Sequence, residues 1–300
     1  MKKMLLGFAA AATLFTACKS DKAIDLKFRL PQGEVVYYTS DMKQTINQTV
    51  MGNAMTVQQD MLFRMAYKVL SVEGTNRTVE IAYDRIKMET DAMGQKIKFD
   101  SQDSTGNNPQ LAMLSGLVGK PFQMTVSEAG KVLSVSGFDA VLNGMTGDPT
   151  DPRAAAARQQ LDQMFSDEAV KEMLSQSTDI YPEQMVKPGD TWTRTHTTSM
   201  GPISMEVANT YKLESATDKT ANVSVNATIT GKSTNSPAGI QGMTVDMKGK
   251  QSGKMEIEIA TGVLQKMDLT QDIEGTMGVQ GMKVPMTIKT VGTITGSKNR

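Results

Sequence analysis

Long stretches of the chain alternate between apolar and polar residues with a period of two. In residues 78–88, Val79, Ile81 and Tyr83 fall on one parity and polar residues dominate the other. Residues 282–288 are apolar at each even position. This period is typical of strands in a sheet that buries one face. Pro285 interrupts the last of these stretches, and it cannot donate to a ladder, so we expect it at a sheet edge or a bulge.

The alternating stretches fall into two groups, separated by turn signals rich in Gly, Asn and Asp. The first group predicts strands over residues 34–51, 55–72, 78–90, 96–103, 122–127 and 131–137. The second group predicts strands over residues 191–200, 203–215, 221–231, 243–260, 263–277 and 282–295. Consecutive strands joined by such short turns indicate antiparallel pairing.

Between the two groups the period changes to that of a helix. Asp151 followed by Pro152 is typical of a helix start, and the pattern predicts a helix over residues 153–165. Ser166, followed by two acidic residues, predicts the cap of a second helix that ends near residue 176. A shorter helix is expected over residues 109–118.

These elements predict a mainly β protein built on a large curved antiparallel sheet, or on two packed sheets, with a short helical segment in the middle. We divide the chain into residues 1–17, 18–26, a β-rich half over 27–140, a helical connector over 141–186 and a second β-rich half over 187–300. Met and Gly are adjacent in several turns of both halves, which suggests a duplication. The alternative is that both residues are simply abundant. The doublets are Met51-Gly52, Met93-Gly94, Met200-Gly201, Gly242-Met243 and Gly281-Met282.

The first residues have the pattern of a secretory signal. Lys2 and Lys3 precede an apolar stretch over residues 4–17, which is shorter than the roughly 20 residues that a spanning helix needs. Cys18, the only cysteine, follows immediately in a context similar to a bacterial lipobox, although Phe15 replaces the usual Leu. We therefore expect residues 1–17 to be a signal peptide. We expect Cys18 to be a lipidated N-terminus, followed by a tether over residues 18–26.

This signal predicts a cell-envelope location, as an outer membrane lipoprotein on the periplasmic side or at the surface. The alternative is that Cys18 is a chance residue in an ordinary signal peptide. Charge adds one exclusion: 32 basic and 32 acidic residues give no net charge, which rules out a nucleic-acid binder driven by bulk charge.

The sequence contains none of the common catalytic or phosphate-binding motifs. His196, the only histidine, shares a strand face with Trp192 and Arg194, and we interpret it as a surface or half-buried residue and not as a catalytic base. Glu256 and Glu258 share a strand face, but such pairs are usually solvated. One Cys and one His cannot form a Cys/His zinc site in one chain. We therefore predict no enzyme, no cofactor and no metal site.

Methionine is the unusual feature of the composition, with 24 residues. Thioethers can bind Cu(I), and Met61 with Met65, or Met243 with Met247, share strand faces. Met also fills irregular gaps in aliphatic cores, and it can line an adaptable groove for an apolar ligand or partner. We prefer core filling, followed by such a groove.

Several stretches together resemble a family of uncharacterised Bacteroidota lipoproteins that carry a domain of unknown function. The stretches lie at residues 83–88, 119–122, 130–138, 165–169, 186–192 and 285–289. The resemblance covers almost the whole chain after residue 18, and it implies no catalytic or binding residue. Read physically, the turn over residues 187–190 starts a strand, and we expect Trp192 to anchor the core of the second half.

The functional hypothesis is a non-enzymatic, lipid-anchored cell-envelope protein that binds an apolar ligand or a protein partner. Its partners would be the membrane, through the lipid anchor, and an apolar molecule or envelope protein, with no nucleic acid. One alternative is a structural or assembly protein of the outer membrane without a ligand cavity. Another is an enzyme of unfamiliar type.

Overall fold

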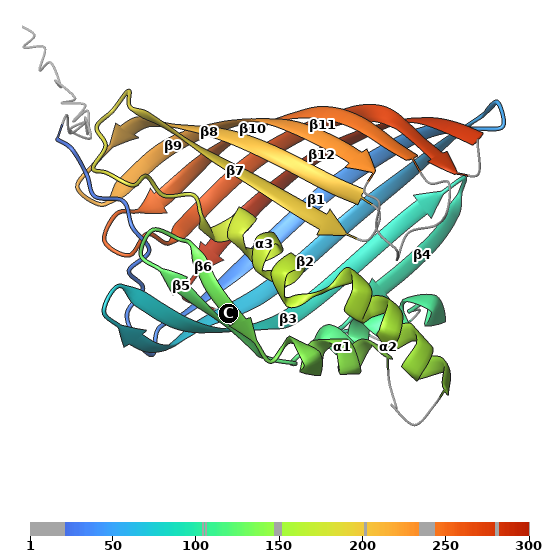
Figure 1. Cartoon of the computed structure of the whole chain (residues 1–300), viewed down its shortest axis with the longest axis horizontal. Coiled ribbons are helices and arrows are strands. Elements are labelled where there is room, and N and C mark those ends of the chain that lie inside the picture. The colour runs from blue at the N-terminus through green and yellow to red at the C-terminus, as the bar shows by residue number, and fades with distance from the viewer. Residues whose placement is uncertain are drawn as a thin grey trace, which may run out of the picture.

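The computed structural model describes residues 22–103, 105, 107–146, 152–200, 203–233, 244–279 and 282–299. Its strands form one 12-stranded, curved sheet in which all paired strands are antiparallel (Figure 1). The strand order is β6-β5-β3-β2-β1-β12-β11-β10-β9-β8-β7, and β4 pairs with β3. The prediction of a mainly β chain with a large curved sheet is confirmed.

The strands of the first half are β1 (Val35–Val50), β2 (Asn53–Glu73), β3 (Asn76–Ala92), β4 (Gln95–Asp100), β5 (Phe122–Ser127) and β6 (Val132–Ser136). Those of the second half are β7 (Thr191–Met200), β8 (Ile203–Ala216), β9 (Thr220–Ser233), β10 (Thr244–Glu258), β11 (Leu264–Val279) and β12 (Met282–Ser297). These bounds agree closely with the alternating stretches of the sequence.

The two halves join where β1, the first strand of the chain, pairs with β12, the last strand of the chain. β1 pairs with β12 from Tyr37–Ser297 to Gln48–Met286, so no boundary divides the strands. Pro285 still pairs with Thr276 of β11 but lies one residue beyond the last β1 partner of β12. At Pro285, β12 pairs with β11 but no longer with β1, which agrees with the expected edge position of the proline.

The helices are α1 (Phe138–Thr146), α2 (Pro152–Met164) and α3 (Asp167–Thr178), and residues Pro109–Leu117 form a 3₁₀ helix, η1. Ser166 caps α3 as predicted, because its Oγ accepts a hydrogen bond from the Ala169 amide. α1 was not predicted. α3 contacts both β6 and β7, the two edge strands, and so bridges the gap between the edges of the curved sheet (Figure 1).

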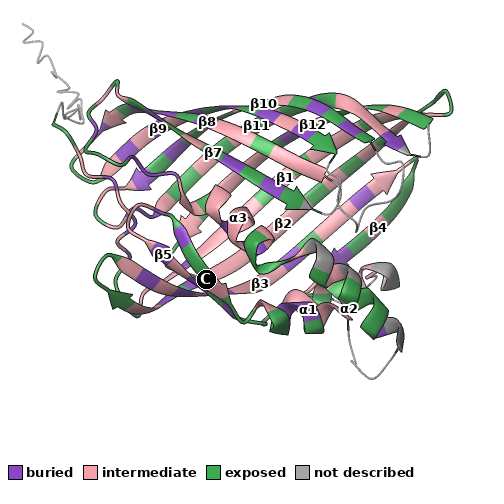
Figure 2. Cartoon of the chain, viewed as in Figure 1, coloured by how far each residue is buried: buried purple, intermediate pink, exposed green. Residues whose placement is uncertain are grey.

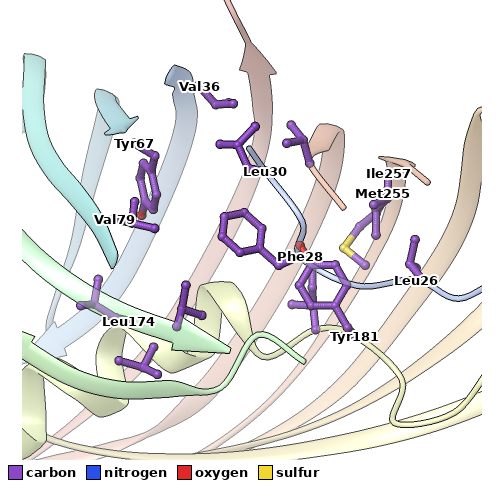
Figure 3. Packing of buried hydrophobic residues seen from close by; sticks show 14 of the residues in the cluster. Leu26, Phe28, Leu30, Val36, Tyr67, Val79, Leu174, Tyr181, Met255 and Ile257 are labelled. Atoms are coloured by element: carbon purple, nitrogen blue, oxygen red, sulfur yellow. The ribbon is translucent and has the colours of Figure 1, made fainter. Parts of the chain in front are cut away.

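An extended segment near the N-terminus crosses one end of the curved sheet. Its residues Leu26, Phe28 and Leu30 alternate into the main core, where they lie near Tyr181 and Ile257 (Figure 3). We call this end the core end. Residues 1–21 lie outside the described residues, and with them the predicted signal peptide and Cys18. The predicted tether over residues 18–26 is too long, because Ile24 already pairs with Val186 and Leu26 is fully buried.

Trp192 anchors the second half, as predicted. Its side chain is 9% exposed, its Nε1 donates to the Ile180 carbonyl at 2.9 Å, and its ring stacks on Tyr211 with centroids 5.5 Å apart. The bond ties the first strand of the second half to the segment that follows α3. The buried indole therefore has both an aromatic partner and a satisfied N–H.

Candidate functional site

The registers of β1–β3 and β10–β12 place six polar residues directly opposite one another on the inward face of the sheet. We call them the polar row. Their direct pairings are Thr90–Gln59, Gln59–Gln44, Gln44–Thr290, Thr290–Gln271 and Gln271–Gln251. Val36 in β1 is fully buried and has the same parity as Gln44, which identifies this face as the inner one.

Side-chain hydrogen bonds connect the polar row across strands. Gln44 Nε2 donates to Thr290 Oγ1 at 3.1 Å, and Gln271 Nε2 donates to Gln251 Oε1 at 3.2 Å. Thr290 and Thr90 are buried. The four glutamine amides hold more donors and acceptors than these two bonds use, so the row has capacity for a neutral hydrogen-bonding partner.

Apolar rows lie on both sides of the polar row. Two residues closer to the core end, a methionine row contains Met42, Met61, Met88 and Leu269. Two residues in the opposite direction, an isoleucine row contains Ile46, Val57, Ile288, Ile273 and Ile229. The inner face is therefore apolar, with one neutral polar band through it.

Solvent reaches the middle of this inner face. At the core end Val36 and Ile257 are fully buried, beneath the N-terminal segment and α3. Farther along the same face of β1, Met42, Gln44 and Ile46 are only half-buried. Figure 2 shows intermediate burial along much of the sheet. An inward-facing apolar surface that water still reaches is unpartnered, because a filled core would exclude that water.

Charge is confined almost entirely to the other face. The described inward-facing strand residues include two charged side chains, Arg77 of β3 and Arg194 of β7, and both are paired. Arg77 Nη2 lies 3.5 Å from Glu128 Oε1, and Arg194 Nε donates to Asp179 Oδ1 at 2.8 Å. The outer face carries Lys, Asp, Glu and Thr. A depression of about 670 Å³ on that face is lined partly by Asp41, Lys254 and Asp268. Such lining suits water more than an apolar ligand.

His196 lies at the β7 end of the isoleucine row, opposite Val207. It is only 8% exposed, so the expected surface or half-buried position is wrong. The reason is that the inward face of β7 is covered by α3, which contacts that strand. Within the described part of the chain its Nε2 is a buried side-chain atom that has no hydrogen-bond partner.

Of the other candidate residues, the carboxylates lie away from this face and two methionines lie on it. Glu256 is exposed on the outer side of β10, and Glu258 accepts a hydrogen bond from Thr261. Met61 and Met65 both face inward, whereas Met243 lies outside the described residues. No group of three or more His, Cys, Asp or Glu residues in the described ranges is arranged to hold a metal ion. No helix in those ranges is long and apolar enough to cross a membrane.

Buried tyrosines close the inner face at the core end. The rings of Tyr38 and Tyr67 meet edge to face, with centroids 5.1 Å apart, and Tyr67 hydrogen-bonds Ser177 of α3. Burial raises the pKa of both phenols well above the ordinary value. Both phenols therefore stay neutral, and the charge of Arg77 at this end of the face is paired with Glu128.

Comparison with known proteins assigns the family. The family of unknown function DUF6263 matches residues 74–264, which include β3 to β10 and all three helices. The chain belongs to this family. No curated protein matches the chain. The DUF6263 match agrees with the domain of unknown function expected from the sequence, and it adds no function.

Solved structures with some likeness are outer membrane proteins. An outer membrane channel from Pseudomonas putida F1 has a TM-score of 0.21 and 8% identity, over 91% of this chain and 98% of that one. The translocator domain of the autotransporter NalP from Neisseria meningitidis has a TM-score of 0.23 and 7% identity, over 88% and 89%. Pseudomonas aeruginosa OccK2 has a TM-score of 0.25 and 6% identity, over 88% and 99%. At such scores the likeness carries no argument about the role of the DUF6263 chain.

Proposed function

We propose that this DUF6263 protein is a non-enzymatic, lipid-anchored cell-envelope protein that binds an uncharged apolar ligand on the inner face of its sheet. One observation carries the proposal: Met42, Gln44 and Ile46 face inward yet remain half-buried, on a face whose charged residues Arg77 and Arg194 are both paired. Apolar surface of this kind is costly to leave in water, and ligand sites are typically concave, apolar and equipped with a few polar groups.

The order of the rows specifies the chemistry of the ligand. The methionine and isoleucine rows would contact apolar portions, and the polar row between them would hydrogen-bond one neutral group such as an ester, amide or hydroxyl. A charged group at this level would have no partner, because Arg194 is already paired with Asp179. The ligand class is therefore a neutral, lipid-like molecule with a polar group between two apolar parts.

Methionine suits such a site because its unbranched thioether adapts to ligands of different shape. Met42, Met61 and Met88 occupy successive strands at one level of the inner face. Lipid-like ligands vary in length and branching, and an adaptable lining accepts that variation better than rigid β-branched residues would.

Cys18 supplies the membrane attachment in this proposal. The position of the only cysteine behind the apolar stretch of residues 4–17 supports acylation there, and the multiple chains on such a residue give stable anchoring. Wild type and Cys18→Ser should be compared by labelling with radioactive palmitate and by fractionation. We expect label and membrane association in the wild type alone; label in the Ser variant would contradict the anchor.

Ligand binding is tested with a neutral fluorescent naphthylamine probe and two matched variants of the acylated protein. Gln271→Glu places a charge in the polar row, whereas Thr270→Glu places the same charge on the outer face of the same strand. We expect Gln271→Glu to weaken probe binding by at least about tenfold, because a carboxylate there lacks a cationic partner. Thr270→Glu should leave binding unchanged.

Ile288→Phe gives a second test if Gln271→Glu unfolds. It adds bulk at a half-buried inward position without adding charge. Reduced probe binding with retained thermal stability would support the inner-face site. Saturable probe binding that neither variant changes would overturn it, and absence of binding to the wild type would favour a structural role.

A further inference from the structure

The hairpins at the end of the sheet opposite the core end carry exposed methionines. β1, β3, β7 and β11 all run toward this end, which we call the far end (Figure 1). Met51 is 80% exposed at the β1–β2 turn and Met93 is 72% exposed at the β3–β4 turn. Met282, at the start of β12, is 46% exposed.

Two of these methionines adopt a backbone conformation that bulky residues avoid. Met51 has φ 50° and Met93 has φ 53°, and each precedes a glycine that also has positive φ. Positive φ at both central residues defines a type I′ turn, for which Asn-Gly or Asp-Gly is strongly preferred. The chain therefore places methionine twice where asparagine would be less strained and more soluble.

The turn residues at the far end carry less charge than those at the core end. The β1–β2 hairpin has no Lys, Arg, Asp or Glu over residues 44–59. Residues 275–282 have none either, and the flanking Glu274 and Lys283 cancel. The β3–β4 hairpin carries Glu89, Asp91, Lys96 and Lys98, two acids and two bases that cancel. At the core end, by contrast, the turns over residues 73–77, 128–131, 187–190 and 217–220 all carry charges.

We propose that Met51, Met93 and Met282 form a rim that inserts into the surface of a neutral lipid bilayer. The proposal deepens the proposed function, because this rim stands at the end of the inner face that the N-terminal segment leaves uncovered. Exposed apolar tips gain free energy on entering lipid, and the turn residues Met51-Gly52 and Met93-Gly94 carry no ions that would have to be desolvated. The backbone strain at Met51 and Met93 is explained if these residues are retained for their contact with lipid and not for the stability of the turns.

A lipid surface fits the rim better than a protein partner does. Protein interfaces draw most of their affinity from Trp, Tyr and Arg anchors. Residues 44–59 and 275–282 contain none of these three types. The lysines nearby are balanced by acids, since Lys96 lies 3.5 Å from Glu89 and Lys283 is matched by Glu274, so the rim has no net positive charge that would favour anionic lipids.

The test places a fluorescent probe beside the rim of the acylated protein. Ala54→Cys is exposed next to the β1–β2 turn and is labelled with a quenchable dye, and Asp218→Cys at the core end is the control site. The protein is held in phosphatidylcholine vesicles through its anchor. A nitroxide-labelled phosphatidylcholine is present either in those vesicles or only in added protein-free vesicles.

We expect quenching of the dye at Ala54→Cys with the nitroxide lipid in at least one of the two vesicle populations. The population that causes quenching identifies the membrane that the rim reaches, either the one that holds the anchor or a second one. The double substitution Met51→Asn and Met93→Asn should reduce quenching by about tenfold, because the protein then loses the two methionine side chains that the lipid would bury. Met185→Asn removes a methionine that is 60% exposed outside the rim and should change nothing. Because Asn suits both turns, the double variant should be at least as thermostable as the wild type.

Two outcomes would overturn the rim. One is absence of quenching in both arrangements, which would leave a protein as the remaining partner. The other is equal quenching in the wild type and the Met51→Asn, Met93→Asn variant. Failure of the anchor is recognised separately in the wild type, whose only cysteine is Cys18. If Cys18 were not acylated, its free thiol would react with the dye. Failure of ligand binding is recognised by lost naphthylamine binding while rim quenching persists.

Discussion

Gln44 and Thr290 are 246 residues apart in sequence, and a side-chain hydrogen bond of 3.1 Å joins them across β1 and β12. Their strands are the seam between the two halves of the chain. Thr290 is 6% exposed, so its hydroxyl has little access to water. The bond therefore belongs both to the candidate ligand face and to the junction between the two halves of the sheet.

Thr290→Val should lower the free energy of unfolding by about 1–3 kcal/mol, because the Gln44 amide loses its partner in a half-buried site. Thr295→Val, an exposed position on the outer face of β12, should stay within about 0.5 kcal/mol of the wild type. Urea unfolding followed by circular dichroism measures both. Equal stability of the two variants would mean that water replaces the Thr290 hydroxyl.

Trp192→Ala should cost about 3–5 kcal/mol, since it removes a large buried ring together with its stacking on Tyr211. Trp192→Phe keeps a ring and loses the bond to the Ile180 carbonyl, at about 1 kcal/mol. Because Trp192 is the only tryptophan, the intrinsic tryptophan fluorescence of the protein comes from this residue alone. Its emission should be blue-shifted and resistant to acrylamide; emission typical of exposed indole in the folded protein would contradict the anchor.

His196→Leu should be neutral or stabilising, because it removes a buried imidazole nitrogen that lacks a partner. His196→Gln keeps polar atoms at the same site and should lose about 1–3 kcal/mol. Urea midpoints distinguish the two. If His196→Gln were the more stable variant, the Nε2 of His196 would have a partner in solution.

The buried tyrosines predict loss of stability at alkaline pH. The pKa values of Tyr38, Tyr67 and Tyr211 are raised by burial, so between about pH 10 and these raised values the unfolded chain binds fewer protons than the folded chain. Stability must therefore fall as pH rises through this window. Phenolate absorbance should appear together with the loss of circular dichroism, and early titration of all tyrosines in the folded protein would contradict the burial.

Gly275→Ala should destabilise the sheet by about 1–3 kcal/mol, in the range of overpacked cores. A Cβ at this position would lie 2.2 Å from the Asp246 carbonyl oxygen, and backbone cannot move aside cheaply. Gly231→Ala is the matched case, because its Cβ would meet the flexible thioether of Met205. We expect the smaller loss there, and thermal unfolding of both variants decides the order.

The sequence alone determined the local architecture of this DUF6263 protein. Strand positions, hairpin turns and the Ser166 cap follow from interactions within a few residues, and alternation identifies them directly. Trp192 was recognisable because a lone large aromatic next to a strand-starting turn has few uses except packing. A Met-lined apolar groove was one of three interpretations of the methionine content. The signal for its polar row was also present, because Gln44, Gln59, Gln251 and Gln271 occupy the apolar parity of their strands.

Only the tertiary structure decided which residues meet. Pairing of β1 with β12 joins segments about 250 residues apart, and its register has no local signature because it depends on the curvature of the whole sheet. His196 is buried because α3 returns to cover β7, a contact that strand alternation cannot reveal. Likewise, Met51 and Met93 belong to separate hairpins, and only antiparallel topology brings them to the same uncovered end of the inner face.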